Sequence, residues 1–147
     1  MKVSDVLAHM NIEAVVRGDI EYSDDLDIAS LNIDYPNDDA PDNEQFHAAA
    51  SLALKENRVK EYSRALQNHI DNVARGKNYE NGFTCATYIN STNENWKQEA
   101  QTFVAWRDAC WEYAIQVLDS VEGGQDAPRI EDFVNNMPTI DWPSALD

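Results

Sequence analysis

The sequence predicts a mainly α-helical protein: an antiparallel helical hairpin plus a short C-terminal helix, with an acidic, partly extended N-terminal arm. Apolar residues recur at helical spacing over two long segments, and glycines follow these segments at Gly76 and at Gly123 and Gly124. The residues before the first segment carry most of the acidic excess. We therefore expect an arm at residues 1–45 and a helical-hairpin domain at residues 46–147.

The arm is the most acidic part of the chain. Residues 1–46 hold twelve acidic side chains against two basic ones, within a total formal charge of −16. Apolar spacing in residues 1–20 predicts a short helix. Apolar residues then largely alternate with polar ones, which predicts an extended segment that lies along a partner protein. The side chains expected to contact that partner are Ile20, Tyr22, Leu26, Ile28, Leu31, Ile33 and Tyr35.

Two long helices are expected after the arm. The first should begin near Pro41–Asn43 and end at Gly76. Four apolar residues seven positions apart predict a heptad-like seam along it: Leu52, Val59, Leu66 and Val73. The second should begin near Ser91, which has the capping-box spacing to Glu94. Residues 77–90 between them predict a short helix or an ordered loop, and Pro128 predicts the first turn of the short C-terminal helix.

The second long helix carries aromatic side chains around most of its circumference, so they cannot all face one neighbouring helix. In one interpretation the arm or the C-terminal tail covers them. In the other, some form a protein–protein interface, where Trp, Tyr and Arg supply much of the binding energy. These interpretations are compatible. Arg107 and Asp108 fit a buried ion pair, an interface anchor or two solvent-facing charges. The residues expected to dock a neighbouring subunit are Trp106, Arg107, Trp111 and Trp142.

No catalytic or metal-binding pattern emerges from the sequence. The three histidines are scattered, no HxxxH or HExxH motif exists, and no glycine-rich phosphate loop is present. Cys85 and Cys110 lie 25 positions apart and predict reduced, packed thiols. We therefore expect no enzyme activity, cofactor or metal. The acidic charge disfavours nucleic-acid binding, and no apolar run approaches the ~18 residues that span a bilayer.

Several sequence fragments together resemble a helical module of tailed-bacteriophage tail proteins. They cover roughly residues 58–143, and the most specific are Ala-Trp-Arg-Asp-Ala at 105–109 and Pro-x-x-x-Trp-Pro at 138–143. Cys85–Tyr88, Ser91–Asn93 and Trp96–Ala100 also match the module. It is associated with tail-fibre and baseplate-region proteins and has no catalytic residues to carry over.

The resemblance implies a structural or adaptor protein that is synthesised in the host cytoplasm and resides in the virion tail. Its expected partners are other phage tail proteins, namely fibre or baseplate subunits, and a homo-oligomer is a further option. Two alternatives remain open. The first is a tail-fibre assembly chaperone that leaves before the virion matures. The second is an acidic DNA mimic that inhibits a host DNA-binding protein, for which the net charge is the supporting observation.

Overall fold

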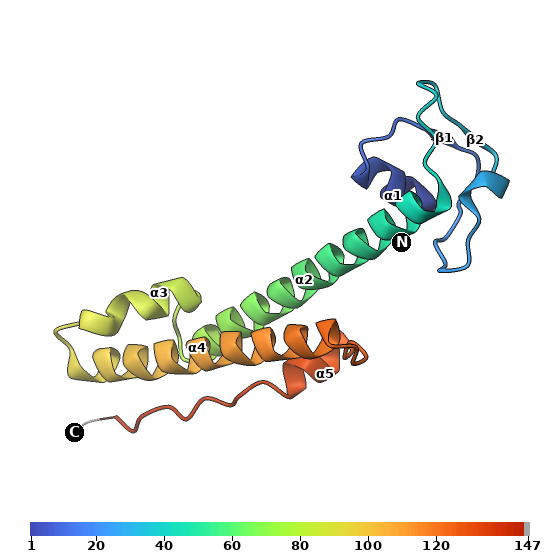
Figure 1. Ribbon diagram of the computed structural model, residues 1–147. Helices are drawn as coiled ribbons and strands as arrows, with labels where there is room; N and C mark the ends of the chain where they lie inside the picture. Colours follow the sequence, from blue (N-terminus) through green and yellow to red (C-terminus); the bar gives the residue numbers. More distant parts are fainter. Residues whose placement is uncertain (146–147) are drawn as a thin grey trace. The chain divides into compact units, whose positions relative to one another are not determined.

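The computed structural model describes residues 1–145, and it is mainly helical as expected, with five α-helices and one two-stranded sheet in that range (Figure 1). The chain forms two compact units, Met1–Arg58 and Val59–Asp147. Their boundary lies inside helix α2 (Asn43–Gly76) rather than after residue 45. The reason is that the first turns of α2 contribute Phe46 and Ala50 to the N-terminal core.

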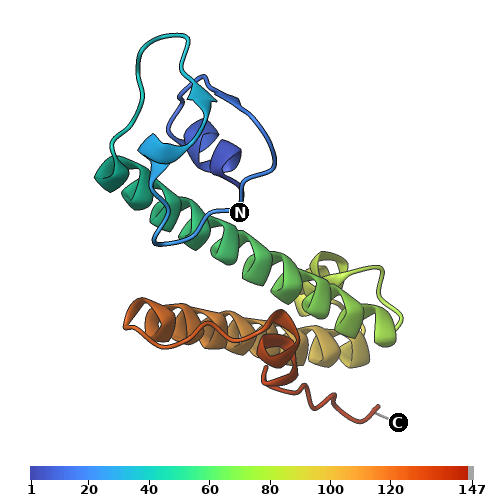
Figure 2. The same cartoon turned by 90° about the vertical axis from the view of Figure 1, so that its right-hand side faces the viewer.

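The N-terminal unit packs helix α1 (Val3–His9) against the first turns of α2 (Figure 2). The backbone N–H of Lys2 donates to Asp5 Oδ2 at 2.9 Å and helps to begin α1. Strands β1 (Val15–Val16) and β2 (Ile33–Asp34) form a two-residue antiparallel pair. The buried side chains of this unit form one cluster: Val3, Val6, Leu7, Ile28, Phe46 and Ala50.

Residues 20–35 are extended only in part. An isolated bridge joins Lys2 to Glu21, and the 3-10 helix η1 (Ile28–Ser30) then interrupts the extended backbone before β2. Asn43, at the start of α2, holds this region in place. Its side-chain oxygen accepts from the Ile28 backbone N–H at 2.8 Å, and its amide nitrogen donates to Asp27 Oδ1 at 2.9 Å.

Helix α2 begins where the sequence predicts it. Asp42 Oδ1 accepts from the Gln45 backbone N–H at 2.8 Å, and Gln45 Oε1 accepts from the Asp42 backbone N–H at 3.3 Å. This reciprocal pair is a capping box that satisfies two backbone donors at the start of the helix.

Within the chain, only Leu66 of the four predicted seam residues is buried. Leu52 is 51% exposed, and Val59 and Val73 are only half-buried. The buried residues in the C-terminal half of α2 instead recur every four positions: Tyr62, Leu66, Ile70 and Ala74. Residues four apart form the ridge that packs against a neighbouring helix.

In the C-terminal unit this ridge packs against helix α4 (Glu94–Glu122). Asn93, rather than Ser91, caps α4: its side-chain oxygen accepts from the Trp96 backbone N–H at 3.2 Å, whereas Ser91 Oγ accepts from the Asn93 backbone N–H. Gly123 and Gly124 end the helix as expected, and Gly124 takes a φ of +100°. The side chains that α4 buries are Ala100, Phe103, Trp106, Cys110 and Ala114.

The segment between the two long helices forms helix α3 (Gly82–Thr87) and the 3-10 helix η2 (Tyr88–Asn90). Asn81 caps α3 by accepting from the Thr84 backbone N–H at 2.9 Å. Gly82 permits a close approach to the neighbouring helices, because a Cβ there would lie 2.8 Å from Ile70 Cγ2 and 3.2 Å from Phe103 Cζ. The Asn-Gly pair therefore begins a helix and does not form a hairpin turn.

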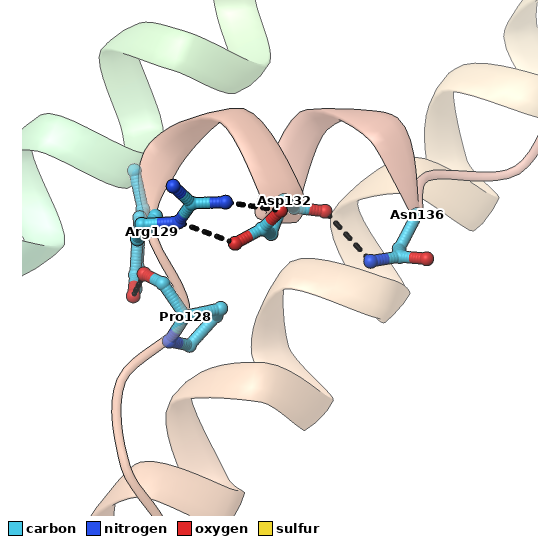
Figure 3. Close-up of polar contacts among 5 residues, drawn as sticks. Pro128, Arg129, Asp132 and Asn136 are labelled. Carbon is cyan, nitrogen blue, oxygen red and sulfur yellow. Dashed lines mark hydrogen bonds and ion pairs between the residues drawn. The ribbon is translucent and has the colours of Figure 1, made fainter.

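Helix α5 (Ile130–Asn135) buries Phe133 in the core of the C-terminal unit. The Tyr62 hydroxyl donates to the Pro128 carbonyl at 2.7 Å. Figure 3 shows Arg129 pointing toward Asp132. Arg129 Nε donates to Asp132 Oδ2 at 2.8 Å. This ion pair is solvent-exposed and contributes little. The cap of α5 is Arg129, so Pro128 lies outside the first helical position predicted for it.

The tail after α5 runs back along α4 toward the start of that helix (Figure 1). Trp106 Nε1 donates to the Pro138 carbonyl at 2.8 Å, and the Trp142 ring stacks on Phe103 at 6.0 Å between ring centroids. The tail therefore covers part of the aromatic surface of α4. None of the helices described in residues 1–145 is both long and apolar enough to cross a membrane.

Candidate functional site

The seven apolar residues of the expected arm contact all pack within the N-terminal unit. Ile28 is 3% exposed, and the other six lie half-buried against the same cluster. Tyr22 also makes polar contacts: its hydroxyl lies 3.1 Å from His47 Nδ1 and donates to Asp24 Oδ1 at 3.0 Å. The Tyr35 hydroxyl is buried without a hydrogen-bond partner among the described residues, and burial raises its pKa. These apolar side chains therefore have an intramolecular partner.

The four predicted docking residues of the C-terminal unit fall into two groups. Trp106 is 6% exposed and Trp142 is half-buried on Phe103, so both contribute to the core. Arg107 and Trp111 lie on a different face of α4, where Trp111 is 37% exposed. Both border an open groove of about 660 Å³ between α2, α3 and α4.

We call this feature the aromatic groove, and α4 supplies half of its lining. Trp111 and Ile115 are its exposed apolar residues on α4, and Ile115 is 56% exposed. Helix α2 contributes one polar and one buried apolar side chain, and α3 completes the third wall. The lining residues are Gln67, Ile70, Gly82, Phe83, Ala86, Arg107, Asp108, Trp111, Glu112 and Ile115.

Phe83 is the main residue of this groove that the sequence interpretation missed. It is 80% exposed, the largest exposed fraction among the large apolar side chains described. Helix α3 turns Gly82 and Cys85 into the core, which leaves Phe83 on the outer face. The signal in the sequence was Asn81 as a helix cap. Once Asn81 is taken as the cap, the helical periodicity of the following turn separates Phe83 from Cys85.

Carboxylates dominate the charge around the groove. Asp108 Oδ1 accepts from Arg107 Nε at 2.9 Å and from Arg107 Nη2 at 2.7 Å. Both side chains are partly exposed, so the two residues form an ion pair that is not buried. Glu112 has no hydrogen bond or ion pair within the described part of the chain. Asp71 lies beside the groove and accepts from the Gly82 backbone N–H at 2.9 Å.

The two cysteine side chains of the C-terminal unit are buried thiols. Cys85 and Cys110 are both 0% exposed and free. Burial raises the pKa of each to about 11, which keeps both thiols protonated near neutral pH. Among residues 1–145 no cluster of three or more His, Cys, Asp or Glu side chains is arranged to hold a metal ion.

Comparisons of the chain with protein-family models, with curated proteins and with solved structures gave no match.

Proposed function

We propose that this protein is a structural or adaptor protein of a tailed-phage tail, in the baseplate or tail-fibre region. It acts by docking other tail proteins, and no enzymatic step is part of the proposal. The sequence resemblance over roughly residues 58–143 supports the assignment to a phage tail. The aromatic groove supports the mode of action.

The observation that carries the docking role is the exposure of Phe83 beside Trp111 and Ile115. An apolar patch bordered by polar residues marks a protein-interaction site more often than a scattered exposed residue does. Aromatic and arginine side chains also contribute disproportionately to interface energy. Trp111 and Arg107 are both present at this groove.

For this role we propose the finer architecture that the sequence predicts. The body is the antiparallel helical hairpin with its short C-terminal helix, supported by the stacking of Tyr62 on Phe133 at 4.6 Å. The acidic N-terminal region is a second contact surface. Because its apolar side chains face their own core, its contribution to docking comes from exposed carboxylates such as Asp24, Asp25 and Asp34.

Quantitative mass spectrometry of purified mature particles tests this function, with a tail protein of known copy number as the calibrant. We expect the chain at a fixed copy number compatible with tail symmetry. Its absence from particles, with abundance in the infected-cell lysate, would reject a structural role and favour the assembly chaperone. Tight association with a host DNA-binding protein and none with tails would favour the DNA mimic.

Phe83→Ala extends the test to the groove. If docking occurs there, particles that carry the variant should contain less of the chain. Leu52→Ala is the matched control, because Leu52 is also exposed, at 51%, but lies in the N-terminal unit. Equal incorporation of the two variants would contradict docking through the groove.

A further inference from the structure

The walls of the aromatic groove constrain the shape of its ligand. All three walls are α-helices, whose backbone groups are already hydrogen-bonded within each helix. An extended peptide would find no free strand edge here to pair with its own backbone. A helix satisfies its own backbone and presents only side chains, so it is the secondary structure that suits this groove.

The spacing of the groove residues on α4 gives the length of the contact. Arg107, Trp111 and Ile115 recur every four positions and therefore form one ridge on the helix. At 1.5 Å per residue this ridge is about 12 Å long, or slightly more than two helical turns. Phe83 of α3 adds an anchor on a second wall of the groove. A partner helix needs apolar residues at positions such as i, i+4 and i+7 to contact this surface.

Charge defines the rest of the ligand. Asp108 and Glu112 line the groove, and Asp71 lies beside it. Arg107 is the single cation among the described lining residues, and it is already paired with Asp108. Glu112 is exposed and unpaired within the described residues. The groove is thus acidic, and it belongs to a chain with a net charge of −16. Lysine or arginine residues beside the apolar face of the ligand would complement it.

We propose that the aromatic groove binds a basic amphipathic helix of another protein, with apolar anchors between Phe83 and Trp111 and cations facing Asp108 and Glu112. This inference rests on the proposed docking function and specifies the chemistry of the partner. A second copy of this chain fits less well. Two copies related by a twofold axis would bring the same acidic grooves together, with −16 on each chain.

Site-specific photo-crosslinking tests the proposal. The full-length chain carries p-benzoylphenylalanine in place of Phe83, is produced during infection, and is irradiated before the crosslinked peptides are sequenced. We expect crosslinks to a segment that has helical apolar spacing and a net positive charge. Crosslinks to an acidic or non-amphipathic segment, crosslinks only to another copy of this chain, or no crosslink at all would each overturn the proposal. As a control, p-benzoylphenylalanine in place of Leu52 measures non-specific crosslinking. It should not crosslink to the segment that position 83 captures.

A binding measurement with a synthetic peptide of the crosslinked segment completes the test. Phe83→Ala should raise the dissociation constant at least tenfold, and the double variant Asp108→Asn with Glu112→Gln should reduce its salt dependence. Leu52→Ala should leave the dissociation constant and its salt dependence unchanged. Equal affinities for Phe83→Ala and Leu52→Ala would refute the site.

These results separate the two proposals. A basic amphipathic helix crosslinked from a protein outside the tail would retain the groove assignment and reject the tail function. A fixed copy number in particles without such a crosslink would do the opposite.

Discussion

Phe133→Ala tests whether α5 is an integral part of the C-terminal unit. The Phe133 side chain is 0% exposed and stacks on Tyr62 at 4.6 Å and on Tyr113 at 5.5 Å between ring centroids. Truncating a buried Phe to Ala costs about 3–5 kcal/mol, because lost transfer free energy and a new cavity add together. Ring contacts contribute about 0.5–1.5 kcal/mol per pair, so we expect the loss of unfolding free energy to lie in the upper half of the range of about 3–5 kcal/mol.

Phe83→Ala is the matched control, because it removes the same atoms from a side chain that is 80% exposed. Its unfolding free energy should change by no more than about 0.5 kcal/mol. Urea titration followed by tryptophan fluorescence is a suitable assay, since all four tryptophans belong to the C-terminal unit. With an m-value of about 2 kcal/mol/M, the Phe133→Ala midpoint should fall by about 2 M. A shift no larger than that of Phe83→Ala would refute the assignment of α5 to the core.

Three further predictions concern the C-terminal unit. Gly82→Ala should lower the unfolding free energy by about 1–3 kcal/mol in the same titration, since its Cβ would meet neighbouring side chains, whereas Gly76→Ala meets nothing within 4 Å and should not destabilise. At pH 8, iodoacetamide should alkylate Cys85 and Cys110 at least ~100-fold more slowly in the folded protein than in the urea-unfolded protein, because burial raises the pKa of both thiols to about 11. Mass spectrometry measures the two alkylation rates. Equal rates would contradict the burial of the thiols. Burial lowers the pKa of His69, so just below pH 6.5 the unfolded state binds more protons than the folded state, and the unfolding free energy should rise with pH there. The assay compares urea midpoints at pH 5.5 and 7.5, and His69→Gln should show a smaller increase between these two pH values than the unsubstituted protein. An equal increase in both proteins would contradict the prediction.

Local signals in the sequence were sufficient to predict helix ends, where a side chain or a glycine affects only the neighbouring turn of backbone. The start of α2 near Asn43 and the end of α4 at Gly123 follow from capping chemistry that operates within a few residues. At Asn81 the local signal left two structures open, a short helix or an ordered loop, because the Asn-Gly pair is shared by turns and helix caps. In the helix that forms, Gly82 packs closely against Ile70 and Phe103, which are distant in the sequence.

For the candidate site, residue type alone was informative but incomplete. Trp106 and Trp111 are both aromatic residues on α4, and nothing in their identity tells that the first is buried and the second borders the groove. Their positions relative to α2, α3 and the C-terminal tail decide this. Phe83 was missed for the same reason, since its exposure depends on which face of the short α3 meets the core.

The sequence by itself determined the helical class, the positions of the long helices and the acidity of the N-terminal third, because periodicity, caps and charge are properties of short stretches of chain. Only the tertiary structure decided which side chains are exposed. Ile28 is buried against the N-terminal cluster, and the four-residue ridge of α2 replaces the heptad seam. The physical reason is that burial depends on contacts between segments far apart in the chain, and a helix with apolar residues on several faces leaves the choice of face to its neighbours.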